Sequence, residues 1–230
     1  IPVSFEMFPP KGELTLDKAR DAAKKLSAYG PDFISVTCSA GGGGNFAQTA
    51  AIASMLESEF NVSSVAHLTC ISLTREGLKE RIAQYKAAGV ENVLALRGDR
   101  APGREAVDFA HASDLIAHLR ASGADLCIGA ACYPEGHVES PTEEESFRAL
   151  YLKQEAGADY LVSQLFFDNE DFYRFREKCL RHRVRLPIVA GIMPFTSVRQ
   201  IQRMAFTCGA SIPAKVVKRL VLAGDDPADQ

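Results

Sequence analysis

The chain has 230 residues, 47% of them hydrophobic, and a formal net charge of −3. That length fits one large α/β domain, and a charge so small and mixed argues against nucleic acid or an acidic membrane as a partner. No apolar stretch is long enough to span a bilayer and no signal peptide is visible, so the default expectation is a cytoplasmic enzyme. The first residue is Ile1 rather than Met, which leaves room for leading residues.

Apolar runs of β type alternate with amphipathic helical patterns along the chain. In order, the predicted strands cover residues 3–8, 33–37, 64–68, 92–96, 125–131, 160–164 and 187–190. The predicted helices cover residues 16–29, 47–59, 74–88, 112–122, 142–156, 169–182, 197–207 and 214–222. Thr74 and Ser197 are helix start signals, and Gly30, Gly89 and Gly157 follow helical patterns as stop signals.

This strict alternation predicts parallel strands joined by right-handed crossovers, either in a doubly wound sheet or in a (β/α)8 TIM barrel. No GxGxxG turn follows the first strand, and the glycine run at residues 41–44 is a weak phosphate signal. Polar residues that cluster just after strands favour the barrel. Only seven units are visible, so we expect a single barrel domain over residues 1–230 that lacks its last βα unit.

The first predicted strand places one acidic residue, Glu6, in an otherwise apolar run. A carboxylate in a covered strand is costly unless it is paired, hydrated or neutral, and burial is how proteins obtain a general acid. An edge-strand glutamate that faces solvent explains this segment equally well. The segment alone leaves both interpretations open.

Polar groups follow most of the other predicted strands, and in a barrel these strand ends converge on one mouth. A lone histidine is more often structural than functional, and an Arg-Gly-Asp turn can be a loop with an internal ion pair. The joint pattern is harder to explain in this way. The groups are Thr37, His67, Arg97-Gly98-Asp99, residues 133–137 and Gln164.

Metal and nucleophile chemistry find little support in the sequence. There is no HxH or HExxH motif, no serine or cysteine in a nucleophile elbow, and no lysine at the end of a predicted strand. The six cysteines lack CxxC or metal-type spacing, and most are expected to be small core residues in a reducing compartment. We therefore expect no metal, and a bound cofactor that carries the difficult chemistry.

Short motifs over nearly the whole chain closely resemble those of methylenetetrahydrofolate reductases, and they run in the order of that family. Each is modest alone, whereas together they are highly specific. They are residues 4–10 (SFEMFPP), 35–37 (SVT), 67–70 (HLTC), 96–99 (LRGD), 112–115 (ASDL), 133–137 (YPEGH), 164–168 (QLFFD) and 191–194 (GIMP), then Gln200 and Ile212-Pro213.

The resemblance implies a barrel that binds FAD non-covalently and reduces 5,10-methylenetetrahydrofolate to 5-methyltetrahydrofolate with NAD(P)H by a ping-pong mechanism. It implies that Glu6 is the general acid and that Asp99 lies beside the flavin and the pterin. Gln164 and Gln200 match residues that contact the folate or the nicotinamide. The residues that match FAD-site positions are Thr37, Ala40, His67, Arg97, Gly98, Asp99, Ala112, Tyr133, His137 and Lys153.

Four positions depart from the pattern of the family: Ser146 and Ala149 on the adenosine side of the implied FAD site, His111 ahead of Ala112, and Met204 near the folate. Two alternatives remain: a non-catalytic barrel that binds folate or flavin, and a different barrel enzyme such as an aldolase or a corrinoid-linked methyltransferase domain. The sequence leaves open the choice between NADH and NADPH, the preferred direction of the reaction and whether the chain forms a homo-oligomer.

Overall fold

A computed structural model describes residues 1–9, 16–38, 46–100, 103 and 105–223. Its strands are β1 (Ser4–Met7), β2 (Phe33–Val36), β3 (Ser63–Thr69), β4 (Asn92–Leu96), β5 (Cys127–Cys132), β6 (Tyr160–Ser163) and β7 (Ile188–Val189). Its helices are α1 (Leu16–Ser27), α2 (Phe46–Phe60), α3 (Arg75–Ala87), α4 (Ala112–Ala121), α5 (Glu143–Glu155), α6 (Asn169–Arg181), α7 (Val198–Cys208) and α8 (Ala214–Ala223). Within these residues, no helix has the length and apolar character needed to cross a membrane.

The structure confirms every predicted strand and helix, with boundaries that differ by no more than two residues. Two of the differences have a clear physical cause at helix starts. Thr74 and Ser197 were predicted inside helices, but they are N-caps with extended backbones. Their side chains accept hydrogen bonds from the N–H groups of Gly77 and Gln200, which have no partner within the helix.

The strand order decides between the two predicted α/β architectures. The sheet runs β1-β2-β3-β4-β5-β6-β7. The strands pair in parallel in β1–β2, β2–β3, β3–β4, β4–β5 and β6–β7. In a doubly wound sheet the order of the strands reverses at a switch point, whereas the strands of a barrel follow one another in chain order. The order is therefore that of a (β/α)8 barrel, of which seven strands lie within the described residues.

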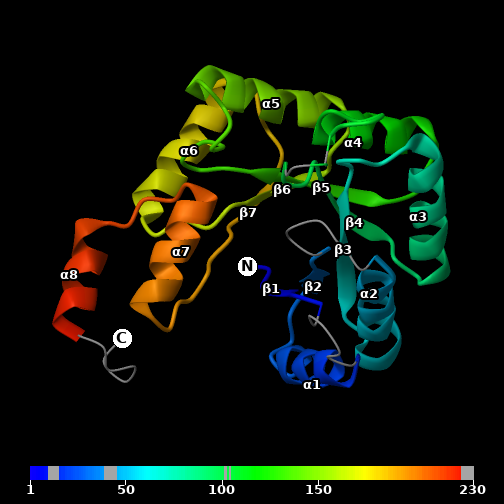
Figure 1. The fold of residues 1–230 in the computed structure, drawn as a ribbon, viewed down its shortest axis with the longest axis horizontal. Helices are drawn as coiled ribbons and strands as arrows, with labels where there is room; N and C mark the ends of the chain where they lie inside the picture. The colour runs from blue at the N-terminus through cyan, green and yellow to red at the C-terminus, as the bar shows by residue number, and fades with distance from the viewer. Residues whose placement is uncertain (10–15, 39–45, 101–102, 104, 224–230) are drawn as a thin grey trace. The chain divides into compact units, whose positions relative to one another are not determined.

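The chain divides into two compact units, each with its own packing. The first unit consists of residues 1–130 with residues 156–158, and the second of residues 131–155 and 159–230. In the first unit α2 packs on β2, β3 and both neighbouring helices, and α4 packs on β4 (Figure 1). In the second unit the Phe147 ring of α5 stacks on Phe175 of α6 and on His182, which directly follows α6.

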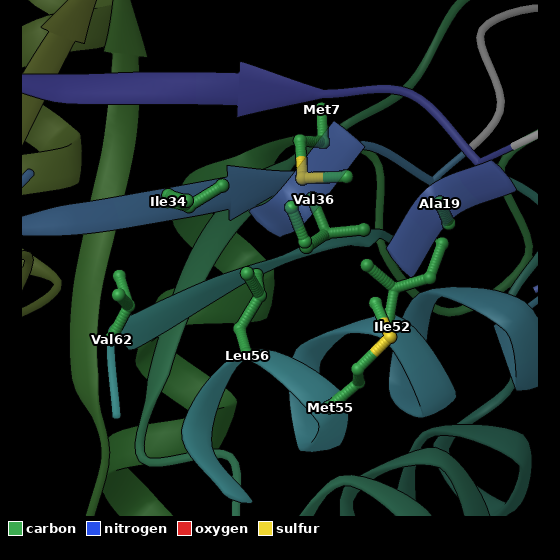
Figure 2. Packing of buried hydrophobic residues seen from close by; sticks show 9 residues of the cluster. Met7, Ala19, Ile34, Val36, Ile52, Met55, Leu56 and Val62 are labelled. Carbon is green, nitrogen blue, oxygen red and sulfur yellow. The ribbon is translucent and has the colours of Figure 1, made fainter. Parts of the chain in front are cut away.

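The core of the first unit shows which face of the sheet its strands turn toward the helices. Met7 of β1 and Val36 of β2 lie in one buried cluster with Ile52 and Leu56 of α2 (Figure 2). Side chains alternate between the two faces of a strand, so the residue before Met7 points away from these helices. Glu6 therefore projects from the face opposite the helix-covered core.

Four of the six cysteines are buried, as the sequence predicted for most of them: Cys38, Cys70, Cys132 and Cys179. Cys127 is exposed and Cys208 is half-buried. Burial raises the pKa of all four buried thiols, in the case of Cys70 to about 12. These groups are un-ionised at neutral pH and behave as small apolar side chains.

Replacing Leu56 by alanine should destabilise the protein by about 2–5 kcal/mol, because this fully buried side chain would leave a cavity between α2 and the sheet. Urea unfolding followed by circular dichroism measures the loss. Leu222→Ala is the matched control, since Leu222 is 87% exposed and its truncation should change the free energy of unfolding by less than about 0.5 kcal/mol. Equal losses in the two variants would contradict the packing described above.

Candidate functional site

Glu6 and His67 meet on one face of the sheet of the first unit. Glu6 lies opposite Ser35 in the β1–β2 register, and Ser35 lies opposite Val65 in the β2–β3 register. His67 is two residues beyond Val65 on β3 and so shares its face. The Glu6 side chain reaches across β2, and its Oε2 atom lies 3.5 Å from Nε2 of His67.

Glu6 has features of both a solvent-facing glutamate and a buried acid, the two interpretations that the sequence left open. Its side chain is 46% exposed, as a solvent-facing residue would be. Nevertheless the pKa of Glu6 is raised, because burial penalises the carboxylate more than a hydrogen bond from Ser35 stabilises it. A carboxyl group can contact water on one side and still lose hydration on the others. Glu6 is therefore an accessible group that binds its proton more tightly than an ordinary glutamate.

His67 is a buried, neutral imidazole. The residue is 8% exposed, and burial lowers the pKa of its side chain to about 4. Its Nε2 atom has no hydrogen-bond partner among the described residues, since the contact with Glu6 is longer than a hydrogen bond. At neutral pH the contact between Glu6 and His67 therefore joins a carboxyl group to an uncharged ring.

Thr37 follows β2 and carries a second unpartnered polar atom. Its main chain is fixed, because its N–H donates to the Met7 carbonyl at 2.9 Å and its carbonyl accepts from the Thr49 hydroxyl at 3.1 Å. Its own Oγ1 atom is buried without a partner in the described part of the chain. Buried polar atoms are nearly always paired, so Thr37 suits a polar ligand that would pair its hydroxyl. Ala40, another predicted FAD-site residue, lies outside the described residues.

The Arg97-Gly98-Asp99 turn follows β4 and lies close against the segment after β3. Gly98 has a φ of +89°, and a Cβ atom there would lie 2.9 Å from Cγ2 of Ile71. The Ile71 N–H donates to the Arg97 carbonyl at 2.7 Å, and Nε of Arg97 donates to the Gly98 carbonyl at 3.1 Å. Only glycine satisfies both the backbone conformation and the close contact, and the turn leaves Asp99 exposed.

Ala112 is the first residue of α4 and is buried. The start of this helix is fixed by Asp114, whose Oδ2 atom accepts hydrogen bonds from the N–H groups of Ala110 and His111. A carboxylate in the first turn also interacts favourably with the positive end of the helix dipole. The Sγ atom of Cys70, just beyond β3, lies 3.7 Å from the His111 carbonyl and ties the two segments together.

In the second unit the structure brings together the three predicted cofactor residues Tyr133, His137 and Lys153. The rings of Tyr133 and His137 meet edge to face with centroids 4.6 Å apart. Nζ of Lys153 lies 5.8 Å from the centroid of Tyr133 and donates to the carbonyl of Ala131 at 2.7 Å. Nδ1 of His137 accepts from the N–H of Glu139. The result is a preorganised group with one fixed positive charge, of the kind that suits an anionic ligand.

The two predicted substrate residues, Gln164 and Gln200, use their side-chain oxygens locally. Oε1 of Gln164 accepts from the N–H of Leu165 at 2.9 Å, just after β6. Oε1 of Gln200 accepts from the N–H and the hydroxyl of Thr196, at the start of α7. Binding of a substrate through these oxygens would compete with the local hydrogen bonds.

Two residues that contact Glu6 or His67 had no predicted role. Ser35 was quoted only as part of a motif, and its hydrogen bond to Glu6 depends on strand register. Tyr85 of α3 is fully buried, and its hydroxyl donates to the main-chain carbonyl of His67 at 2.8 Å. In a sequence, the sign of such a contact is a tyrosine on the apolar face of a helix, because its buried hydroxyl needs a hydrogen-bond partner.

Similarity to solved structures supports the fold class. One such structure, described as an uncharacterized protein from Clostridium thermocellum that binds two copies of 5-methyl-5,6,7,8-tetrahydrofolic acid, matches with a TM-score of 0.70. The match covers 97% of this chain and 77% of the other, at 14% sequence identity. At that identity the likeness shows a shared fold alone, here that of an α/β barrel.

Sequence similarity then identifies the family. The family model described as methylenetetrahydrofolate reductase matches residues 1–230. The chain is 38% identical to the probable methylenetetrahydrofolate reductase (NADH) of Oryza sativa subsp. japonica, over 94% of this chain and 39% of the relative. It is 33% identical to the 5,10-methylenetetrahydrofolate reductase of Escherichia coli (strain K12), over 98% of this chain and 75% of the relative. The chain belongs to the methylenetetrahydrofolate reductase family, and it spans about two fifths of the length of the plant relatives.

The buried His67 should make the protein less stable as the pH falls from about 6.5 to 4. Its pKa is 6.5 when unperturbed and about 4 in the folded chain, so over this range only the unfolded chain gains the proton. The corresponding loss is about 3 kcal/mol. His67→Gln should remove this loss, which urea unfolding at a series of pH values measures in both proteins. The raised pKa of Glu6 has the opposite effect, since it makes the folded protein more stable as the pH falls. Both proteins contain Glu6, so comparing the variant with the parent protein reduces this contribution. Parallel stability curves for the two proteins would be the contrary result.

Proposed function

We propose that this protein reduces 5,10-methylenetetrahydrofolate to 5-methyltetrahydrofolate with NAD(P)H and a non-covalently bound FAD. The proposal rests on the contact of an accessible Glu6, whose pKa burial raises, with a neutral His67. Membership of the methylenetetrahydrofolate reductase family supports the choice of substrate. The names of the rice, Arabidopsis and maize relatives include NADH, which favours NADH as the reductant. We also propose a cytoplasmic location, which is the default expectation from the sequence.

Glu6 acts as the general acid in this proposal. It donates its proton to a nitrogen of the five-membered ring of the folate, the bond from that nitrogen to the methylene carbon breaks, and the resulting iminium accepts a hydride. A positioned acid of this kind accelerates a reaction by roughly 10²–10⁴-fold. The raised pKa of Glu6 increases the fraction of molecules that hold the proton near neutral pH.

Each unit, taken by itself, has residues whose chemistry suits part of FAD. In the first unit, Thr37 offers a buried Oγ1 atom that lacks a partner among the described residues, and His67 matches a FAD-site position. In the second unit, Lys153 beside Tyr133 supplies a counter-charge suited to a pyrophosphate. When bound, FAD would accept hydride from NAD(P)H and later pass it to the folate, which is the ping-pong sequence. Gln164 and Gln200 are assigned to binding of the folate or the nicotinamide.

Glu6→Gln should permit reduction of the bound flavin by NADH but abolish turnover of methylenetetrahydrofolate, because glutamine has the same size and cannot donate the proton. Anaerobic stopped-flow absorbance measures the two half-reactions separately. Glu80→Gln on α3 is the matched control, since Glu80 is exposed and should leave both half-reactions unchanged.

Three outcomes would count against this assignment. Loss of flavin reduction in Glu6→Gln would show that Glu6 is structural. A colourless parent protein that takes up no added FAD would exclude the flavoenzyme. A protein that binds flavin or folate without turnover would support the alternative of a non-catalytic binding barrel.

Asp99→Asn should raise the reduction potential of the bound flavin. A carboxylate near the isoalloxazine disfavours the negative charge gained on reduction, by a few kcal/mol at an effective dielectric constant of about 20. Redox titration against a reference dye measures the change. Asp21→Asn on α1 is the control, because Asp21 is exposed and lies on a helix to which no cofactor role is assigned. An unchanged potential in Asp99→Asn would place this carboxylate away from the flavin.

A further inference from the structure

We propose that His67 is a positioning residue for Glu6, holding the protonated carboxyl group through its Nε2 atom, and that Tyr85 fixes His67 through its main chain. The catalytic meaning of this arrangement rests on the proposed function. The arrangement itself is a property of the first unit and can be measured without turnover.

Glu6 of β1 and His67 of β3 lie on the face of the sheet opposite the helix-covered core, separated by β2. The Glu6 carboxyl extends over Ser35 and ends 3.5 Å from the imidazole. Because the Nε2 atom is buried without a hydrogen-bond partner among the described residues, a donor at this position would remove the cost of leaving it unpaired.

Glu6 and His67 differ in how readily they take up a proton. Burial lowers the pKa of His67 to about 4 and raises that of Glu6 above its usual 4.5. As the pH falls, Glu6 therefore takes the proton before His67 does. A neutral carboxyl group is a hydrogen-bond donor, and a neutral imidazole has one nitrogen that accepts. The acid O–H of Glu6 can then point at Nε2 and shorten the contact to hydrogen-bond length.

His67 is held in place through its main chain. The hydroxyl of the fully buried Tyr85 donates to the His67 carbonyl at 2.8 Å. Tyr85 is itself held by Phe46 of α2, whose ring stacks on it with centroids 4.9 Å apart. The Arg81 guanidinium lies 4.2 Å above the ring of Phe46. A chain of packed groups from α2 and α3 thus reaches the strand residue that faces Glu6.

Other ionisable groups lie in the same region. The charge of Arg81 lowers the pKa of the Tyr85 hydroxyl, and Cys38 raises it. Arg81 also lowers the pKa of the Cys38 thiol. The pKa of His67 is set by its burial, and that of Glu6 by burial and by Ser35. The behaviour of the Glu6–His67 pair is therefore governed by hydration and by its own hydrogen bonds.

The test is an NMR titration of the purified chain, with and without added FAD. Labelling of glutamate carboxyl carbons gives the pKa of Glu6, whose signal is assigned by its loss in Glu6→Gln. Labelling of imidazole nitrogens gives the protonation state of His67, whose Nε2 should be the unprotonated nitrogen. In Tyr85→Phe and in His67→Gln the pKa of Glu6 should fall by roughly half a unit or more, because water or an amide donor then favours the carboxylate.

The double variant Tyr85→Phe/His67→Gln separates an action through His67 from an independent one. The pKa of Glu6 in the double variant should equal that in His67→Gln, because Tyr85 acts only through the residue that is already replaced. Tyr29→Phe is the matched control: it removes the hydroxyl of a tyrosine that is 79% exposed and packs against Phe5, and it should leave the pKa of Glu6 unchanged.

An unchanged pKa of Glu6 in both single variants, or a proton on Nε2 of His67, would overturn the proposal. Additive shifts in the double variant would overturn the part that concerns Tyr85. Circular dichroism checks that each variant folds, and if Tyr85→Phe does not, His67→Gln still decides whether His67 positions Glu6. These readouts do not depend on flavin or folate chemistry, so the proposal can fail while the proposed function stands, and the reverse.

Discussion

The alternation of side chains along parallel strands is the constraint on which the rest of the first unit depends. One set of residues on β1 and β2, including Met7 and Val36, packs against α2 and supplies the core. The residue that precedes each of these on its strand must point the other way, and this is why Glu6 and Ser35 lie together on the opposite face. A change of register by one residue would bury the acid in the core and expose its apolar neighbours. The pairing of β1 with β2 therefore fixes both the packing of the core and the position of Glu6.

The raised pKa of Glu6 comes from burial of its carboxyl group, although nearly half of the side chain stays exposed. A residue with nearly half of its side chain exposed can receive a substrate, whereas a fully buried one cannot. The neutral state of His67 matters in this context, because a charged imidazole at the same distance would stabilise the carboxylate and lower its pKa. The arrangement combines access for a ligand with a raised pKa, two properties that suit the general acid proposed above.

The fold could be predicted from the sequence because its signals are local and repeated. Alternating strands and helices, with caps such as Ser197, gave the element order and the fold class. The site was less accessible to such reasoning. The sequence singled out Glu6 and His67 separately, but their contact depends on register across three strands. Tyr85 was missed because its role is a single hydrogen bond to a main-chain carbonyl from a helix 18 residues farther along the chain.

The glycine of the Arg97-Gly98-Asp99 turn sets a limit on how this region can vary during evolution. Gly30 also has a positive φ, but a Cβ atom there would contact nothing within 4 Å, so asparagine could replace it at modest cost. At Gly98 the side chain of Ile71 occupies the space as well. A neutral drift to another residue at Gly98 would need a prior change to a smaller residue at position 71. The two positions are therefore expected to change together, if they change at all.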